Sequence, residues 1–186
     1  MTTRKEARAA RAAAELDDIE STLVSHGRPT DAERLVARLK ELNWTLGVAE
    51  SLTGGLVAAA VVAVPGASAV LRGGVVAYAT DLKQTLLGVD ETLLAAHGPV
   101  HPRVAGQMAE GARRALGRGA DPADVGIATT GIAGPVSPDG QPVGTVHLAV
   151  STPLGSRVES LQLSGDRDQI RAEAVTLALR LAFEAL

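Results

Sequence analysis

Short apolar segments with strand character alternate with helical segments along most of the chain, and this order constrains the fold more than any other feature. Strand patterns occupy residues 44–50, 73–80 and 124–131, with helical patterns between them. Two further strand patterns, 145–152 and 157–165, follow each other with no helical segment between them. Alternating elements place helices on both faces of a sheet, and consecutive strands make part of that sheet antiparallel. The sequence therefore predicts an α/β fold, a three-layer α/β/α sandwich with a mixed central sheet.

The predicted helices carry start signals as well as apolar spacing. Thr30 is a candidate N-cap for a helix over 31–42, because its hydroxyl can accept a hydrogen bond from a first-turn amide. Asp166 is a candidate cap for the C-terminal helix for the same reason. Helical patterns place the remaining helices over residues 56–64, 90–98, 102–116 and 166–186.

The chain is long enough for one ordinary domain. Its 186 residues are 46% hydrophobic and 21% charged, which is a globular composition. Residues 1–25, rich in Ala, Arg and Glu, are predicted to form an N-terminal helical arm or partly ordered extension, and residues 26–186 a single domain. No segment approaches the ~18 apolar residues of a membrane span, and the N-terminus lacks an apolar signal-peptide core. We therefore expect a cytoplasmic protein with no membrane partner.

Charge and composition argue against nucleic-acid partners and against metal or cofactor sites. The formal net charge is −3 and only 2% of the residues are aromatic, so neither a basic surface nor base-stacking platforms are expected. The absence of cysteine excludes thiolate nucleophiles and cysteine-ligated zinc. His97 and His101 flank Gly98-Pro99 and cannot share a helix face as metal ligands would, and His147 is interpreted as structural. We expect no metal and no cofactor.

Ser51 stands where a predicted strand ends and two glycines open a helix. Its hydroxyl could cap that helix or contact a phosphate, because first-turn amides lack partners inside a helix. It could instead be a nucleophile, with the amides near Leu52 and Thr53 holding an oxyanion and Gly54 and Gly55 letting a substrate approach the backbone. The surrounding sequence is neither a G-x-S-x-G elbow nor a P-loop. Local sequence leaves both interpretations open.

A nucleophilic serine needs a base, and Lys83 is the candidate that remains after the histidines. To act as a base, this lysine must lose roughly two to three units from a reference pKa of about 10.4, through burial or a neighbouring cation. The alternative interpretation is a solvated surface lysine. Tyr78, the single tyrosine of the chain, ends the preceding strand and is either part of the site or a half-buried strand aromatic.

A second loop can bind an anionic or polar ligand. Thr129 and Thr130 end a strand beside Gly131, so hydroxyls and backbone amides converge at the carboxyl end of that strand. Arg167 begins the last helix and suits a phosphate or carboxylate, although an exposed salt bridge explains it equally well.

Several of these segments together resemble the C-terminal domain family of the competence/damage-inducible protein CinA, which also occurs as a stand-alone nicotinamide-nucleotide amidohydrolase. They occur in the family's order over about residues 31–186, and they are "VAESLTGG", "PGAS", "GGVVAYATDLKQTLLGV", "HGPV", "TTGIAGP", "PVGTVHLAV" and "SGDRD". The resemblance implies a serine/lysine amidohydrolase that converts nicotinamide mononucleotide to nicotinate mononucleotide and ammonia. It also implies a homodimer or higher homo-oligomer.

Residue by residue, the resemblance implies a role for each matching position. The nucleophile falls on Ser51, the lysine base on Lys83, the family's tyrosine on Tyr78 and an auxiliary serine on Ser68. The substrate-binding positions implied by these motifs are Thr53, Gly54, Gly55, Thr130, Gly131 and Arg167.

The chain departs from the family pattern at several positions, of which Thr80 and His101 bear on substrate choice and efficiency. Leu52 replaces the usual cysteine, Thr80 the usual asparagine, and His101 a usual serine. A low-turnover nucleotide-binding or partner protein is therefore the alternative to an enzyme. A role in DNA uptake, which the family's name suggests, finds no support in the charge or aromatic content.

Overall fold

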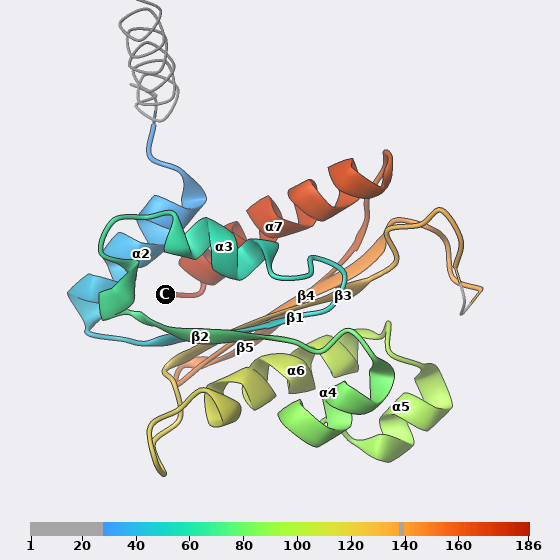
Figure 1. The fold of residues 1–186 in the computed structure, drawn as a ribbon, viewed down its shortest axis with the longest axis horizontal. Coiled ribbons are helices and arrows are strands. Elements are labelled where there is room, and N and C mark those ends of the chain that lie inside the picture. Colours follow the sequence, from blue (N-terminus) through green and yellow to red (C-terminus); the bar gives the residue numbers. More distant parts are fainter. Residues whose placement is uncertain (1–27, 138–139) are drawn as a thin grey trace, which may run out of the picture.

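Five strands form one mixed sheet in the order β2–β1–β3–β4–β5 (Figure 1). The computed structural model describes residues 28–137 and 140–186. β1 pairs in parallel with β2 and β3, whereas β3–β4 and β4–β5 are antiparallel. The predicted mixed sheet is confirmed. The strands are β1 (Leu46–Glu50), β2 (Leu71–Val76), β3 (Val125–Gly131), β4 (Thr145–Thr152) and β5 (Gly155–Gln162).

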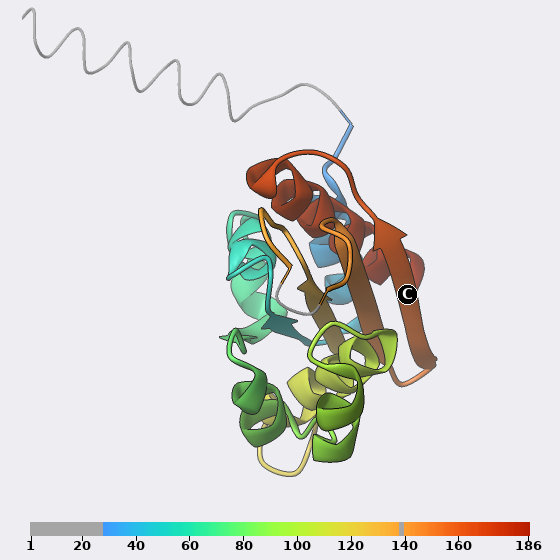
Figure 2. The same ribbon diagram turned by 90° about the vertical axis from the view of Figure 1, so that its right-hand side faces the viewer.

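Helices cover both faces of this sheet, which makes three layers (Figures 1 and 2). One layer contains α2 (Asp31–Leu42), α3 (Leu56–Val62) and α7 (Arg167–Glu184). The other contains α4 (Thr80–Leu87), α5 (Glu91–His97) and α6 (Pro102–Ala115). The three-layer α/β/α sandwich is therefore confirmed.

The apolar core is divided in the same way, because successive side chains of a strand point to opposite faces. In β1, Leu46 and Val48 pack in the cluster beneath α2, α3 and α7, and Ala49 packs in the cluster beside α6. Each face of the sheet thus has its own buried aliphatic layer, and β1 itself is wholly buried.

The predicted caps at Thr30 and Asp166 are confirmed. Each side chain accepts amide hydrogen bonds at the start of its helix, and each forms a capping box with the residue three positions later, Glu33 and Gln169 respectively. Such a cap contributes about 1 kcal/mol of stability. The caps fix where α2 and α7 begin, and therefore where Arg167 stands.

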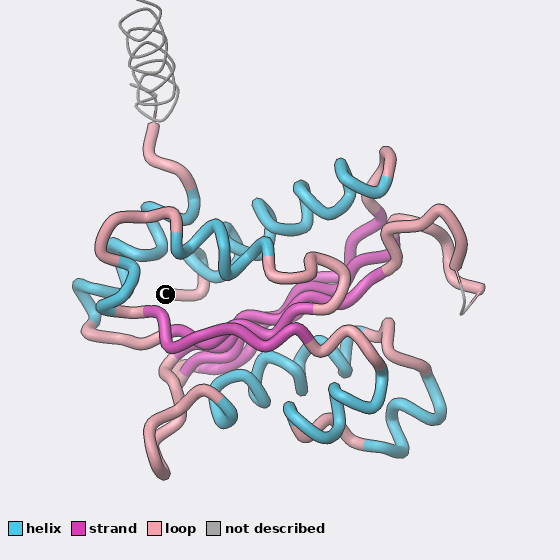
Figure 3. The backbone as a smooth tube through the Cα atoms, viewed as in Figure 1, coloured by secondary structure: helices cyan, strands magenta, loops and turns pink. Residues whose placement is uncertain are grey.

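The structure contains one helix, α4, that the sequence does not predict, and the strand before it is shorter than predicted. The sequence predicts a strand over 73–80, but β2 ends at Val76 and residues 80–87 form α4. The N-cap of α4 is Ala79, whose side chain makes no capping hydrogen bond, so no start signal marks this helix in the sequence. Figure 3 shows the short loop between the strand and α4.

The carboxyl ends of β1, β2 and β3 meet at one edge of the sheet, because these three strands are parallel. The chain crosses from β1 to β2 on one side and later returns to β3 on the other, so β1 is the topological switch point where open α/β sheets bind ligands. Within residues 28–137 and 140–186, no helix combines the length and apolarity that crossing a bilayer requires. The predicted arm, residues 1–25, lies outside the described residues.

Candidate active site

The end of β1 places Glu50 and Ser51 on opposite faces of the sheet. The Glu50 carboxylate turns toward α3 and accepts hydrogen bonds from the amides of Gly55, Val57 and Ala58 at 2.9, 3.1 and 2.9 Å. Glu50, not Ser51, therefore satisfies the first turn of α3. The capping interpretation of Ser51 is wrong, and its hydroxyl points toward α4 instead.

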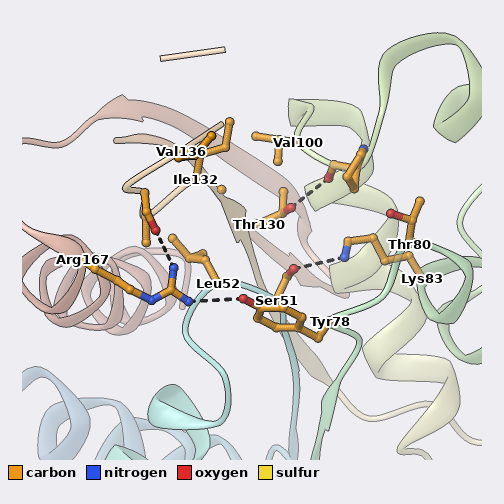
Figure 4. Close-up of a pocket in the computed structure, with 14 residues that line it drawn as sticks. Ser51, Leu52, Tyr78, Thr80, Lys83, Val100, Thr130, Ile132, Val136 and Arg167 are labelled. Carbon is orange, nitrogen blue, oxygen red and sulfur yellow. Dashed lines mark hydrogen bonds between the residues drawn. The ribbon is translucent and has the colours of Figure 1, made fainter. Parts of the chain in front are cut away.

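Lys83 is the partner of that hydroxyl. Its Nζ lies 3.1 Å from Ser51 Oγ (Figure 4). It also lies 2.7 Å from the carbonyl oxygen of Ala77. The lysine is only 1% exposed. Burial lowers its pKa from 10.5 to about 8. A neutral amine in this place can donate to Ala77 and accept the proton of Ser51, which is the arrangement of a nucleophile, a base and a group that orients the base.

A cavity of about 370 Å³ opens beside this pair, within the range of small-molecule sites. Figure 4 shows side chains from several separate segments converging on it. The lining residues are Ser51, Leu52, Tyr78, Thr80, Lys83, Pro99, Val100, Thr130, Gly131, Ile132, Ala133, Gly134, Val136 and Arg167. The structure therefore brings Ser51, Tyr78, Lys83, Thr130, Gly131 and Arg167 together, as the sequence predicts for a common site.

Arg167 closes one side of the cavity. Its guanidinium donates to the carbonyl oxygen of Gly134 at 2.8 Å and to the hydroxyl of Tyr78 at 3.2 Å (Figure 4). Tyr78 is 61% exposed. Within the described residues the tyrosine hydroxyl has no hydrogen bond to Ser51 or Lys83. The tyrosine thus contacts the arginine at the rim and not the serine–lysine pair.

Thr130 holds the opposite wall in place. Its hydroxyl donates to the carbonyl oxygen of Pro99 at 2.8 Å, which ties the loop between α5 and α6 to the end of β3. Gly131 is required by packing, since an added Cβ would lie 2.7 Å from the carbonyl oxygen of Thr145. Both residues line the cavity.

Three predicted substrate contacts, Thr53, Gly54 and Gly55, do not line the cavity. The Thr53 hydroxyl is buried and lies 2.7 Å from that of Thr129. Gly54 and Gly55 have φ values of 61° and 102°, a region that favours glycine. These residues shape the turn after Ser51 and do not border the space open to a ligand.

One backbone amide of this turn, that of Leu52, is unpaired in the described part of the chain and belongs to a residue that lines the cavity. Among the described residues, the N–H groups of Leu52 and Thr53 have no hydrogen-bond acceptor, whereas the Ser51 N–H donates to the carbonyl oxygen of Thr129 at 3.0 Å. Arg171 supports the turn from α7, donating to the carbonyl oxygens of Leu52 and Thr53 at 3.0 and 3.2 Å. Nothing in the linear sequence distinguishes this arginine from other arginines of α7.

Ser68 is not part of the site, and its predicted auxiliary role is corrected here. It lies exposed in the short 3₁₀ helix η1 (Ala67–Ala69), immediately before β2. Lys83 and Ala77 follow the carboxyl end of β2. Ser68 and the cavity are therefore at opposite ends of the same strand.

Three histidines of the described residues, His97, His101 and His147, lie near one another. The rings of His97 and His101 stack with centroids 4.6 Å apart, although the two residues are on different elements. Burial, then the neighbouring His97 and Arg103, lowers the pKa of His101. Burial, then His101, also lowers the pKa of His147, whose ring Nδ1 lies 2.9 Å from the Ser160 hydroxyl.

No cluster of acidic, histidine or cysteine side chains with metal-binding geometry is found in the part of the chain that the structure describes. The potential ligands at the cavity are hydroxyls, one amine and one guanidinium. The arrangement therefore offers nucleophilic and proton-transfer chemistry by the protein's own side chains.

Comparisons with known proteins give a consistent result. The family model described as the CinA C-terminal domain matches residues 29–186. A CinA-like protein of Frankia casuarinae is 53% identical over 137 residues, which are 74% of this chain and 30% of that protein. A CinA-like protein of Anaeromyxobacter sp. (strain Fw109-5) is 47% identical over 184 residues, 97% of this chain and 43% of the relative. The chain thus spans less than half the length of these relatives.

A solved structure has the same fold. The crystal structure of a CinA superfamily protein from Klebsiella pneumoniae matches with a TM-score of 0.77 at 32% sequence identity, covering 83% of this chain and 94% of that one.

Proposed function

Because the chain belongs to the CinA C-terminal domain family, we propose that it is an amidohydrolase converting nicotinamide mononucleotide to nicotinate mononucleotide and ammonia. The observation that carries the proposal is the contact of a buried, pKa-lowered Lys83 with Ser51 at the mouth of a cavity. A structural serine in a nucleotide-binding protein would not require a buried lysine beside it, because burying an amine is costly.

In the first step, the neutral amine of Lys83 accepts the Ser51 proton while Ser51 Oγ attacks the carboxamide carbon. The carbonyl π electrons move onto oxygen, and the N–H group of Leu52, a residue that lines the cavity, donates to the resulting oxyanion. The cationic pyridinium ring of the substrate opposes protonation of Lys83 before the reaction starts.

The tetrahedral intermediate then collapses. Its C–N bond breaks as the Lys83 ammonium returns a proton to the departing nitrogen, which leaves as ammonia. The product on the protein is a nicotinoyl ester of Ser51. Water attacks this ester with Lys83 again accepting a proton, and the Ser51 alkoxide leaves and is reprotonated by Lys83.

The remaining cavity residues fit the nucleotide part of the substrate. Arg167 presents a guanidinium at the rim, and a guanidinium pairs with phosphate oxygens through directed hydrogen bonds. The Thr130–Gly131 wall borders the space left for the ribose. On this view the nicotinamide ring lies at Ser51 and the phosphate at Arg167.

The deciding experiment measures ammonia release from nicotinamide mononucleotide by the full chain. We expect turnover in the wild type and in Ser68→Ala, whose exposed side chain lies at the far end of β2. Ser51→Ala and Lys83→Met should abolish turnover while retaining the fold and nucleotide binding. Binding without turnover in the wild type would indicate a nucleotide-binding protein, and unchanged turnover in both catalytic variants would overturn the mechanism.

A further inference from the structure

We propose that Glu50 is a positioning residue for the serine–lysine pair: it fixes the strand end that carries Ser51 to both α3 and the peptide that orients Lys83. This inference rests on the proposed use of Ser51 as a nucleophile. It assigns to the residue before the nucleophile a task that its local sequence gives no reason to expect.

The side chain of Glu50 joins the end of β1 to the start of α3. It is only 1% exposed and its two oxygens accept three amide hydrogen bonds from the start of α3. The N-cap of α3 is Gly55, which has no side chain to do this. One carboxylate therefore defines where α3 begins relative to β1, and the turn that carries Ser51 joins these two elements.

The main chain of Glu50 joins β1 to the peptide that orients Lys83. Its carbonyl oxygen accepts the Ala77 N–H at 2.9 Å. The carbonyl oxygen of the same Ala77 accepts from Lys83 Nζ at 2.7 Å. Two consecutive hydrogen bonds thus connect Glu50 to the base, while a single covalent bond connects it to Ser51.

Burying the Glu50 carboxylate carries a free-energy cost. Among the described residues no lysine, arginine or histidine forms a salt bridge with Glu50. A buried carboxylate without a cation depends on its hydrogen bonds, and three amide donors are what this one has. Ser, Thr or Asp near Gly55 would cap the helix at lower cost, but would not join α3 to the end of β1.

Glu50→Gln is the sharpest variant, since it keeps the shape of the side chain. Its amide nitrogen would face N–H donors, so the three hydrogen bonds cannot all form. Asp90→Ala is the control, because Asp90 likewise accepts hydrogen bonds from amides, those of Thr92 and Leu93, at the start of α5 and lies outside the cavity lining. Alanine is needed here, since a single oxygen of Asp90 accepts both amides and asparagine would keep that acceptor. Both variants lose stability through a weakened cap.

The readout is the rate at which a small sulfonyl fluoride labels Ser51, followed by mass spectrometry with Ser51→Ala as the blank. We expect Glu50→Gln to be labelled about 100-fold more slowly, since a displacement near 1 Å has that effect on a reacting group. Its kcat for nicotinamide mononucleotide should fall in parallel, with KM within about threefold of the wild-type value. Asp90→Ala should match the wild type in labelling and kcat.

Equal labelling of folded Glu50→Gln and wild type would overturn the inference, and so would an unreactive Ser51 in the wild type. If Glu50→Gln fails to fold, the same labelling comparison is made with Ala58→Pro. This variant removes the Ala58 N–H, one of the three donors to Glu50, at a position in the first turn of α3, where proline is tolerated. Slower labelling of that variant supports the inference and an unchanged rate overturns it. Absence of ammonia release in the wild type would reject the proposed substrate, while the labelling comparison still tests Glu50.

Discussion

Lys83 Nζ lies 3.1 Å from Ser51 Oγ, and the two residues are 32 positions apart in the chain. Ser51 follows β1 and Lys83 lies in α4 after β2. Because β1 and β2 are parallel neighbours, the two carboxyl ends are adjacent and the pair meets at one edge of the sheet. Both the activity and the stability of the protein should depend on the protonation of Lys83 in this pair.

Activity should depend on pH through the state of Lys83. Burial holds its pKa near 8, and only the neutral amine can accept the Ser51 proton. We therefore expect kcat/KM to rise about tenfold per pH unit below that value and to level off above it. A rate profile in overlapping buffers measures this. A profile flat from pH 6 to 9 would exclude Lys83 as the base.

Stability should also depend on pH through Lys83, with a defined sign. The folded pKa of about 8 lies below the unfolded value of 10.5, so between these values the unfolded chain binds more protons and stability rises with pH. Below pH 8 both states are protonated and the folded state carries the full cost of a buried ammonium.

Lys83→Met removes that cost. We expect this variant to be about 1–3 kcal/mol more stable than the wild type at pH 7, because burial no longer opposes a charge. The gain should disappear above about pH 10.5. Urea unfolding at several pH values measures it. A variant less stable than the wild type at pH 7 would show that the amine stabilises the fold.

Arg167→Gln tests whether the rim arginine holds the phosphate. The substitution removes the guanidinium that contacts Gly134 and Tyr78. We expect KM for nicotinamide mononucleotide to rise about 10- to 100-fold, since a charge-assisted hydrogen bond to an anion is lost. The matched substrate is nicotinamide riboside, which lacks the phosphate and should show little change. An equal loss with both substrates would assign Arg167 to the cavity wall alone.

Thr53→Val tests the reassignment of Thr53 from substrate contact to internal support. The buried hydroxyl of Thr53 pairs with Thr129 at 2.7 Å, and its loss leaves the Thr129 hydroxyl without this partner. We expect a destabilisation of about 1–3 kcal/mol. KM should stay close to the wild-type value, because Thr53 does not line the cavity. Thermal unfolding and steady-state kinetics measure both effects, and a large rise in KM would return Thr53 to the ligand site.

The sequence predicts much of this architecture, because its signals are local. Apolar periodicity indicates the parallel and antiparallel strands, and Thr30 and Asp166 mark their helices by short-range capping. The α4 helix carries no such mark, since Ala79 offers no capping side chain. The sequence therefore places Lys83 just past the strand, and the structure shows that it lies within a helix.

In the candidate site, too, the sequence indicates some residues and not others. The resemblance of motifs identifies Ser51 and Lys83 but also assigns Ser68 to the site. Ser68 precedes the predicted strand 73–80 and Lys83 follows it, so the strand prediction itself places the two at opposite ends. The roles of Glu50 and Arg171 depend on hydrogen bonds to main-chain groups. Every residue type has such groups, so the sequence does not indicate these contacts. Such contacts become visible only when the elements are packed together.

The carboxylate of Glu50 also limits how a ligand can enter. In many doubly wound domains the helix after the first strand receives the phosphates of a bound nucleotide at its amino end. Here the carboxylate of Glu50 already accepts the hydrogen bonds of those amides. An incoming phosphate would therefore find no free amide donors there and would be repelled by the negative charge of the carboxylate. In the proposed substrate complex the nucleotide would therefore have the opposite orientation, with its phosphate directed toward Arg167 at the amino end of α7.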